Sequence, residues 1–416
     1  MPVPSALWSP QARMTTAPER QIVITEGDGA YVTTSTGQRL FDGTAGLWFA
    51  NIGHGRADMA RVAAEQIQRL ETHHVFGRFR NDRALELAET LAGLSPLGEA
   101  KVILNSGGSD AIDVACKLAR RFWVLRGRPQ KRTILSREHA YHGLHAYGTS
   151  VAGLDFNREG YGTESLVPET ARVDTHTLAG LEAAIHRIGP GQIAAYIAEP
   201  VMGTGGVIPP RDEYFAGVRR LCDAHDILFI ADEVITGFGR TGEMFATSRF
   251  GLRPDLLTFA KGVTSGYAPL GGVLVGPRVW APFFTGGSDA PIFRHGVTYS
   301  GHATAAALAL HNLDILAAEG LIARAAHLEG VLSDLLADLA MHELVEDVRV
   351  SGFLGGVQLN TAVDADALAD ALIEHGFITR ALRGNTLQIS PPFVATEQEL
   401  RDLIAAIRGA LDNVEA

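Results

Sequence analysis

Cysteine is scarce in this chain: its 416 residues include only Cys116 and Cys222. A secreted protein held together by disulfides would need more cysteines at closer spacing, so that class is excluded. Both cysteines fall in apolar segments with helical spacing, which indicates buried free thiols. One long-range disulfide between them is the alternative.

Other features are missing as well. No run of Lys and Arg stands out and the net charge is -11, which argues against a nucleic-acid-binding protein. The first 20 residues have no charged start followed by an apolar run, so we expect no signal peptide. No apolar stretch reaches the roughly 18 residues of a membrane span. We therefore expect a cytoplasmic enzyme.

What is present is an ordinary globular composition, with 46% apolar and 20% charged residues. From residue 101 to about 275, short apolar runs alternate with helix-like segments, a rhythm typical of a mostly parallel sheet flanked by helices. Around this region we expect hairpin strands at 21–48, helices at 57–92, a helix at 302–318, and a smaller α+β unit at about 330–416. The strands expected in the sheet are Lys101–Leu104, Thr133–Leu135, Ile193–Ile197, Ile227–Ile230, Asp255–Phe259 and Gly272–Val275.

A glycine-rich turn, NSGGS at 105–109, lies between the first expected strand and a helix. Gly107 and Gly108 allow backbone N–H groups to converge on an anion at the helix start, and Ser109 adds a hydroxyl donor. A glycine turn with a serine cap explains the same residues equally well. The spacing excludes the nucleoside-triphosphate loop G-x-x-x-x-G-K-[ST].

Two charged residues follow buried-looking strands. Asp232 comes after Ile227–Ala231 and Lys261 after Leu256–Ala260, so both are expected at the carboxyl edge of the sheet, where ligands bind in open α/β folds. Glu233 should point the other way. A buried lysine can serve in Schiff-base chemistry. Taken singly, each residue is better explained by an ion pair or by a lysine that reaches solvent.

Taken together, these features suggest a specific cofactor. Pyridoxal phosphate needs a phosphate site, an amine for its aldehyde and an acid at its pyridine nitrogen. Asp232, Lys261 and the turn at 105–109 supply all three within one α/β region. Tyr141, after the strand at 133–135, could cover the ring.

Two competing patterns carry less weight. GFGRTG at 237–242 matches the dinucleotide motif G-x-G-x-x-G, but no long periodic helix follows it and no acid ends a following strand. We expect these glycines to form a turn beside the site, with Arg240 packed nearby. His139, His142 and His145 have metal-like spacing, but Gly143 interrupts any helix there, and we expect no metal.

Several segments in this order resemble the class III, or omega, aminotransferases of the fold-type I pyridoxal-phosphate enzymes, and the resemblance spans nearly the whole chain. The segments are GTAGLWFANIGHG (43–55), NSGGSDA (105–111), AYHG (140–143), AEP (198–200), ADEVITGFGRTG (231–242), FAKGVTSGYAPLGG (259–272), HGVTYSGH (295–302) and GNTLQISPPF (384–393). SGGSDA and GHA depart mildly from the family's more frequent forms.

The resemblance implies a role for each matching residue. Lys261 would form the Schiff base with pyridoxal 5'-phosphate and move protons, and Asp232 would pair with the pyridine nitrogen. Tyr141 and Val234 would flank the ring, with His142 and Glu199 nearby. Gly108 and Ser109 would bind the phosphate, with Thr298 reaching it from the partner subunit. Trp48 would line an amine–pyruvate-like substrate pocket or else be a core aromatic. Arg380, or alternatively Arg383, would bind the substrate carboxylate, a surface arginine being the other reading.

The implied protein is a homodimeric α/β enzyme with shared active sites. It has a large, mostly parallel seven-stranded domain (56–318) and a smaller α+β domain (319–416), to which residues 1–55 contribute. The implied reaction is ping-pong transfer of an amino group from an amine or omega-amino acid to a keto acid such as pyruvate. The alternatives are a racemase, aminomutase or decarboxylase on the same fold, an NAD-dependent oxidoreductase, or an inactive scaffold.

Overall fold

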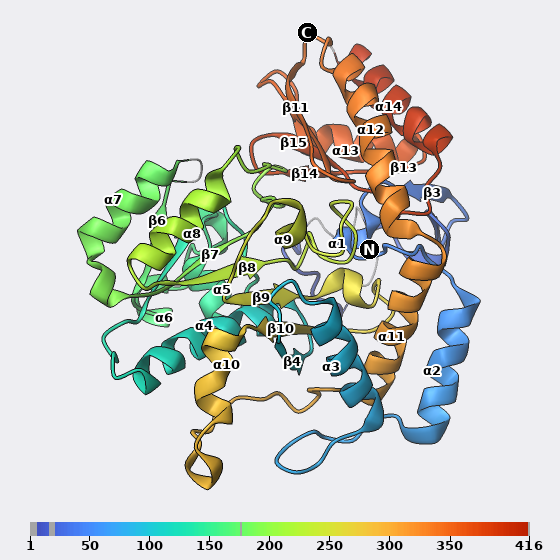
Figure 1. Ribbon diagram of the computed structural model, residues 1–416. Coiled ribbons are helices and arrows are strands. Elements are labelled where there is room, and N and C mark those ends of the chain that lie inside the picture. Colours follow the sequence, from blue (N-terminus) through green and yellow to red (C-terminus); the bar gives the residue numbers. More distant parts are fainter. Residues whose placement is uncertain (1–5, 16–20, 175–176, 415–416) are drawn as a thin grey trace.

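The computed structural model describes residues 6–15, 21–174 and 177–414, and its centre is a seven-stranded sheet (Figure 1). The strand order is β4-β10-β9-β8-β7-β5-β6. β10 runs antiparallel to both of its neighbours, and the other pairs are parallel. The strands are β4 (Lys101–Asn105), β5 (Thr133–Arg137), β6 (Thr170–Val173), β7 (Ile193–Ala198), β8 (Leu228–Asp232), β9 (Leu256–Phe259) and β10 (Gly271–Val275).

The prediction of a mostly parallel sheet and its six strands is confirmed. β6 was missed because its four residues, TARV, are mostly only half-buried at the sheet edge and form no apolar run. The central strands carry apolar residues on both faces because helices cover both. Leu228 and Ile230 pack toward α4 (Gly108–Leu125), whereas Phe229 packs toward α7 (Leu178–Ile188) and α8 (Tyr214–Ala224).

A smaller unit lies beyond the sheet, at the top of Figure 1. Its antiparallel sheet has the order β11-β12-β15-β14. These strands are β11 (Val345–Val350), β12 (Gly355–Leu359), β14 (Arg380–Leu382) and β15 (Thr386–Ile389), and the helices are α12 (Leu321–Leu339), α13 (Ala365–Glu374) and α14 (Glu397–Asp412). The expected single strand region at 348–359 is a hairpin.

The two ends of the chain meet in a third sheet. β1 (Ile24–Asp28), β2 (Tyr31–Thr34) and β3 (Arg39–Asp42) form antiparallel pairs, and β13 (Phe377–Ile378) joins β3 in parallel. On this basis we propose that residues 1–55 belong with 319–416 and that 56–318 form the large domain. The expected lead-in at residues 1 to about 20 lies partly outside the described residues.

The remaining helices connect these parts. The helical region at 57–92 is two helices, α2 (Ala57–Leu70) and α3 (Asp82–Leu94), which pack against α11 (Ala303–Ala318). The short ones are α1 (Ala45–Trp48), α5 (Ala146–Val151), α6 (Thr163–Leu166), α9 (Ala246–Arg249) and α10 (Pro277–Phe284), with 3₁₀ turns at Asp155–Asn157, Pro190–Gln192, Lys261–Val263 and Gly287–Asp289.

Two further expectations concern thiols and membranes. Cys116 and Cys222 are free and buried, as predicted. In the described part of the chain, no single helix is long and apolar enough to cross a membrane. Only α11 and α12 taken together, across a 59° bend, meet that length and composition.

Candidate active site

A pocket of about 150 Å³ opens at the carboxyl edge of the large sheet. β8 brings Asp232 to it, β9 leads into Lys261, and the start of α4 follows β4. Its lining comprises Gly108, Ser109, Ile112, Tyr141, His142, Gly143, Glu199, Asp232, Val234, Ile235, Ala260 and Lys261. Eight of the residues singled out in the sequence therefore meet in one cavity.

The Asp232 carboxylate is 5% exposed and held from several sides. Its Oδ2 lies 2.7 Å from His142 Nδ1. Its Oδ1 accepts hydrogen bonds from Val234 N (3.1 Å) and from the Thr258 hydroxyl (3.2 Å). A buried carboxylate with this many partners has a fixed position, as an acid facing a ring nitrogen requires. Glu233 turns away, as expected, to bond Thr236 and the start of α9.

Lys261 has a left-handed backbone conformation and an ammonium group with a lowered pKa. Its φ is +47°, a left-handed value that costs a non-glycine residue about 1–3 kcal/mol. Burial lowers the pKa of its ammonium group to about 8, although Asp232 and Glu199 oppose that shift. A lysine with such a pKa supplies neutral, nucleophilic amine near neutral pH.

The start of α4 fits a phosphate group. The N-cap residue of this 18-residue helix is Gly107, which has no side chain to cap it. Asn105 Oδ1 accepts from Gly107 N (3.3 Å), but no side-chain acceptor in the described residues meets the N–H groups of Gly108 and Ser109, which leaves them for another acceptor. Ser109 Oγ, at the same turn, accepts from Leu144 N at 3.2 Å. A Cβ at Gly108 would lie 2.9 Å from Val234 Cγ1, so a larger side chain would close the cavity between helix start and ring site.

A flat ring and its polar edge also fit the cavity. Tyr141 and Val234 line it. His142 Nε2 is buried and has no hydrogen-bond partner within the described structure. Glu199 accepts from Tyr141 N (3.2 Å) and Gly203 N (2.9 Å), and burial raises the pKa of its carboxyl group, with Asp232 adding to that rise. Pyridoxal phosphate matches this set: an anion site, an amine, a fixed acid and a narrow apolar slot.

Trp48 and Arg380 lie together beside Lys261. The Arg380 guanidinium lies 4.3 Å from the centroid of the Trp48 ring, and Lys261 Nζ lies 5.6 Å from it. Burial lowers the pKa of Arg380 to about 10, while Tyr141 opposes the shift. Arg383, the alternative, is exposed in the turn after β14. The structure thus brings Arg380, rather than Arg383, to Trp48.

Other predicted residues lie outside this pocket. Thr298 is exposed on the surface of the single chain. The segment at 237–242 forms turns and is followed only by the four-residue α9. Arg240 in that segment is fully buried and donates to Phe353 O, Ser390 O and Pro391 O of the smaller unit. The dinucleotide interpretation is therefore wrong, and the expected turn with a packed arginine is confirmed.

Two of the three spaced histidines have different partners. His142 bonds Asp232, whereas His145 Nδ1 lies 3.3 Å from Asp110 Oδ1.

Sequence reasoning missed residues that support the site from behind. Asn312 in α11 donates to Gly262 O (2.9 Å) and Val263 O (3.0 Å), which holds the turn that carries Lys261. Its signal was a polar residue in an otherwise Ala/Leu-rich helix. Asp42, at the end of β3, organises the segment that carries Trp48; the residue is 2% exposed.

Comparison with known proteins agrees with this geometry. A family model described as "Aminotransferase class-III" matches residues 14–411. Putrescine–pyruvate aminotransferase of Pseudomonas aeruginosa is 36% identical, over 95% of this chain and 91% of that protein. A transaminase structure from the marine bacterium Virgibacillus superposes with a TM-score of 0.93 at 38% identity, covering 98% of this chain and 97% of that one. An amine transaminase from an uncultivated Pseudomonas species, solved in its PLP-bound form, superposes with a TM-score of 0.93 at 36% identity, covering 99% of each chain.

Fold and site together define a pyridoxal-phosphate-dependent transaminase. More narrowly, the chain belongs to the class III aminotransferases.

Proposed function

We propose that Lys261 and Asp232 are the catalytic pair of this transaminase, and that it moves an amino group from a primary amine to a keto acid. The observation that carries this proposal is that both side chains line one cavity with Gly108 and Ser109 at the start of α4. The bound cofactor supplies an aldehyde carbon for the amine and a ring that takes up electron density.

The chain's own residues would do the rest. The Lys261 amine would bond the cofactor aldehyde and later move a proton at the substrate carbon. Asp232, fixed by His142 and Thr258, would keep the ring nitrogen protonated. Gly108 and Ser109 would anchor the phosphate, while Tyr141 and Val234 would flank the ring. Trp48 would line the substrate side, and Arg380 would pair with a carboxylate.

The first prediction concerns Lys261. In the Lys261→Ala variant we expect loss of the yellow absorbance of bound cofactor and of turnover by at least about 10³-fold, because no other described residue of this pocket offers an amine. The assay is the half-reaction absorbance change with putrescine, followed by pyruvate consumption. Lys131→Ala is the matched control, because Lys131 is also buried with a pKa lowered to about 8, and it lies outside the pocket.

Stoichiometric consumption of pyruvate would separate transamination from racemisation or decarboxylation. Putrescine and pyruvate are the first substrates to test because they appear in the name of the relative described above. Full activity in Lys261→Ala would end the proposal.

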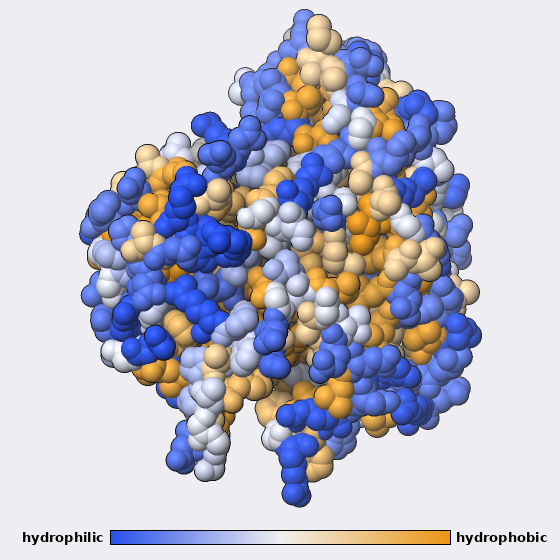
Figure 2. All heavy atoms as spheres, viewed as in Figure 1, coloured by the Kyte–Doolittle hydropathy of each residue, from blue (hydrophilic) through white to orange (hydrophobic). Residues whose placement is uncertain are grey.

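We also propose that the enzyme is a homodimer with shared sites. An apolar groove of about 780 Å³ is lined by residues 75–77 and 292–296. Phe76, Leu85 and Ile292 along it are 47–61% exposed, which is unusual for large apolar side chains clustered together. Figure 2 shows the molecule hollowed at its lower edge, between the segment after α10 and the loop before α3. A second copy over this groove would bring Thr298 toward the neighbouring site.

The second prediction tests this assembly. Sedimentation equilibrium should give twice the 44.4 kDa chain mass for the wild type. Ile292→Asp should shift it to the single-chain mass, because a charge cannot be buried in an apolar interface without a partner. Met341→Asp, at an 85% exposed apolar residue elsewhere, is the control. A wild type with the single-chain mass at micromolar concentration would refute the dimer.

A further inference from the structure

The segment that carries Trp48 has a strained backbone. Ala45, Gly46 and Trp48 have φ values of +48°, +63° and +62°, and Gly46 combines its φ with a ψ of -105°. That pair of angles is open only to glycine, and positive φ is costly for the other two. Such a conformation persists only when surrounding contacts enforce it.

The contacts converge on one carboxylate, Asp42, at the end of β3. Asp42 Oδ1 accepts from the backbone N (3.1 Å) and hydroxyl (2.9 Å) of Thr44. Asp42 Oδ2 accepts from Gly46 N (2.7 Å) and lies 2.8 Å from His54 Nε2. Burial raises the pKa of Asp42, but hydrogen bonds from His54 and Thr44 outweigh it, so the pKa lies below its usual range. The ionised group thus holds both ends of the segment 44–54.

His54 is itself fixed on the other side. Its backbone exchanges two hydrogen bonds with Gly29, at 3.1 and 2.8 Å. Its Cβ would lie only 2.7 Å from a Cβ at Gly27. The His54 ring therefore reaches Asp42 from an anchored backbone, and its side chain is only 20% exposed.

Two hydrogen bonds of Gly43 also position the strand that carries Arg380. Gly43 N donates to Ile378 O (3.0 Å), and Ser390 N donates to Gly43 O (2.7 Å). Two residues beyond Ile378, the Arg380 guanidinium lies over the Trp48 ring. Arg380 Nε is buried without a partner among the described residues, so the ring face is a principal contact of this desolvated cation.

We propose that Asp42, with His54 as its partner, is a positioning residue that fixes Trp48 beneath Arg380 and so favours substrates that carry a carboxylate. Asp42, Trp48 and Arg380 are not among the residues that line the pocket, but the centroid of the Trp48 ring lies 5.6 Å from Lys261 Nζ, so Asp42 would act through Trp48. A guanidinium that is already held in place loses less conformational entropy on pairing with a carboxylate than a mobile one does. This inference rests on the proposed function and adds a determinant of substrate class to it.

The test compares two three-carbon acceptors, pyruvate and propanal, of which only pyruvate carries a carboxylate; the difference between ketone and aldehyde cancels when the ratio of a variant is compared with that of the wild type. In Asp42→Asn one of the two acceptor oxygens becomes an NH2 donor, so the side chain cannot accept from Thr44 N and Gly46 N at the same time, and the segment that carries Trp48 loses one of its anchors. We expect the ratio of kcat/KM for pyruvate to that for propanal to fall about tenfold, the effect of one hydrogen bond to a charged group. The loss should lie mainly in KM for pyruvate. Amide hydrogen exchange at residues 43–54 should accelerate, with or without bound cofactor.

Two variants of His54 test the same inference if the Asp42→Asn variant does not fold. His54→Gln keeps a donor near the Nε2 position and should retain the wild-type ratio, whereas His54→Leu should lower it as Asp42→Asn does. Equal changes for both acceptors, or equal behaviour of the two His54 variants, would overturn the inference. If the wild type uses neither acceptor, the proposed function fails. If it uses both and Asp42→Asn keeps the ratio, only this inference fails.

Discussion

At the scale of single residues, two properties of Lys261 lower the free energy of unfolding. Lys261 adopts a left-handed backbone, and burial lowers its pKa to about 8. The chain's sequence revealed Lys261 and Asp232 because each ends an apolar run. It could not reveal Asp42 or Thr258, because Asp42 accepts from the backbone N–H of Gly46 only in the local conformation that the fold enforces, and the Thr258 hydroxyl reaches Asp232 from the neighbouring strand.

The third prediction is the pH dependence of the Lys261 cost in the cofactor-free protein. Below pH 8 both folded and unfolded chains hold the proton and the cost is full. Between pH 8 and 10.5 the folded chain loses it first, so stability rises with pH. The stability gain of Lys261→Met over wild type should therefore shrink by about 2 kcal/mol between pH 7 and pH 10, measured by urea unfolding. A gain that is constant with pH would contradict the assignment.

At the scale of elements, apolar runs predicted six strands of the large sheet because those strands are covered on both faces. β6 escaped because it is short and lies at the sheet edge. The hairpin β11–β12 was taken for one strand region since its turn, SGFL at 351–354, has only one glycine. The break between α2 and α3 was unmarked by proline. Capping residues such as Asn81, which accepts from Ala84 N at 2.8 Å, mark helix starts only once the helix is known.

The fourth prediction concerns the start of α14. Thr396 and Glu399 form a capping box: the threonine hydroxyl accepts from Glu399 N (3.2 Å), and the Glu399 side chain accepts from Thr396 N (2.7 Å). Thr396→Ala should lower the free energy of unfolding by about 1 kcal/mol. Thr396→Ser should be near wild type. Gln398→Ala, which removes only an exposed bond to Asp402, should cost a few tenths of that.

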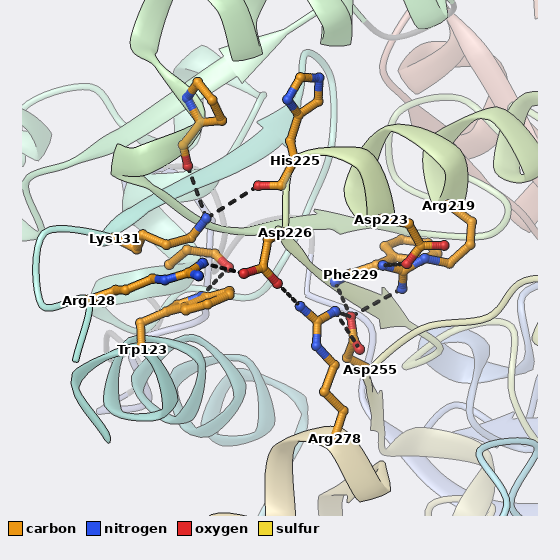
Figure 3. Close-up of polar contacts among 12 residues, drawn as sticks. Trp123, Arg128, Lys131, Arg219, Asp223, His225, Asp226, Phe229, Asp255 and Arg278 are labelled. Atoms are coloured by element: carbon orange, nitrogen blue, oxygen red, sulfur yellow. Dashed lines mark hydrogen bonds and ion pairs between the residues drawn. The ribbon is translucent and has the colours of Figure 1, made fainter. Parts of the chain in front are cut away.

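At the scale of the whole molecule, charges far apart in sequence tie the amino ends of the central strands β8 and β9 to the neighbouring helices (Figure 3). Asp255 is 8% exposed and accepts from Arg219 (3.1 Å), Arg278 (3.2 Å) and Phe229 N (2.8 Å). Asp226 pairs with Arg278 and Arg128 but is 46% exposed. Such pairings, like the groove at 75–77 and 292–296, depend on tertiary structure and were absent from the sequence patterns.

The fifth prediction compares these two acids. Asp255→Asn should cost about 3 kcal/mol in the free energy of unfolding, because it leaves the buried Arg219 without its buried acid. Asp226→Asn should cost less than about 1 kcal/mol, since exposed pairs contribute little. Chemical denaturation of both variants, with cofactor absorbance as a check of the native state, measures the difference. Equal costs would show that burial does not decide the value of these pairs.

The pairing of β3 with β13 has a consequence for biosynthesis. A ribosome releases residue 42 long before residue 377, so the growing polypeptide carries the unpaired edge of β3 through most of its synthesis, and Arg240 waits for its acceptors Ser390 O and Pro391 O until nearly the end. The large sheet can form while translation continues, whereas the hydrogen bonds of Gly43 with Ile378 and Ser390 can form only when the last tens of codons are translated. A prematurely terminated chain would thus possess a nearly complete cofactor cradle and no organised substrate side.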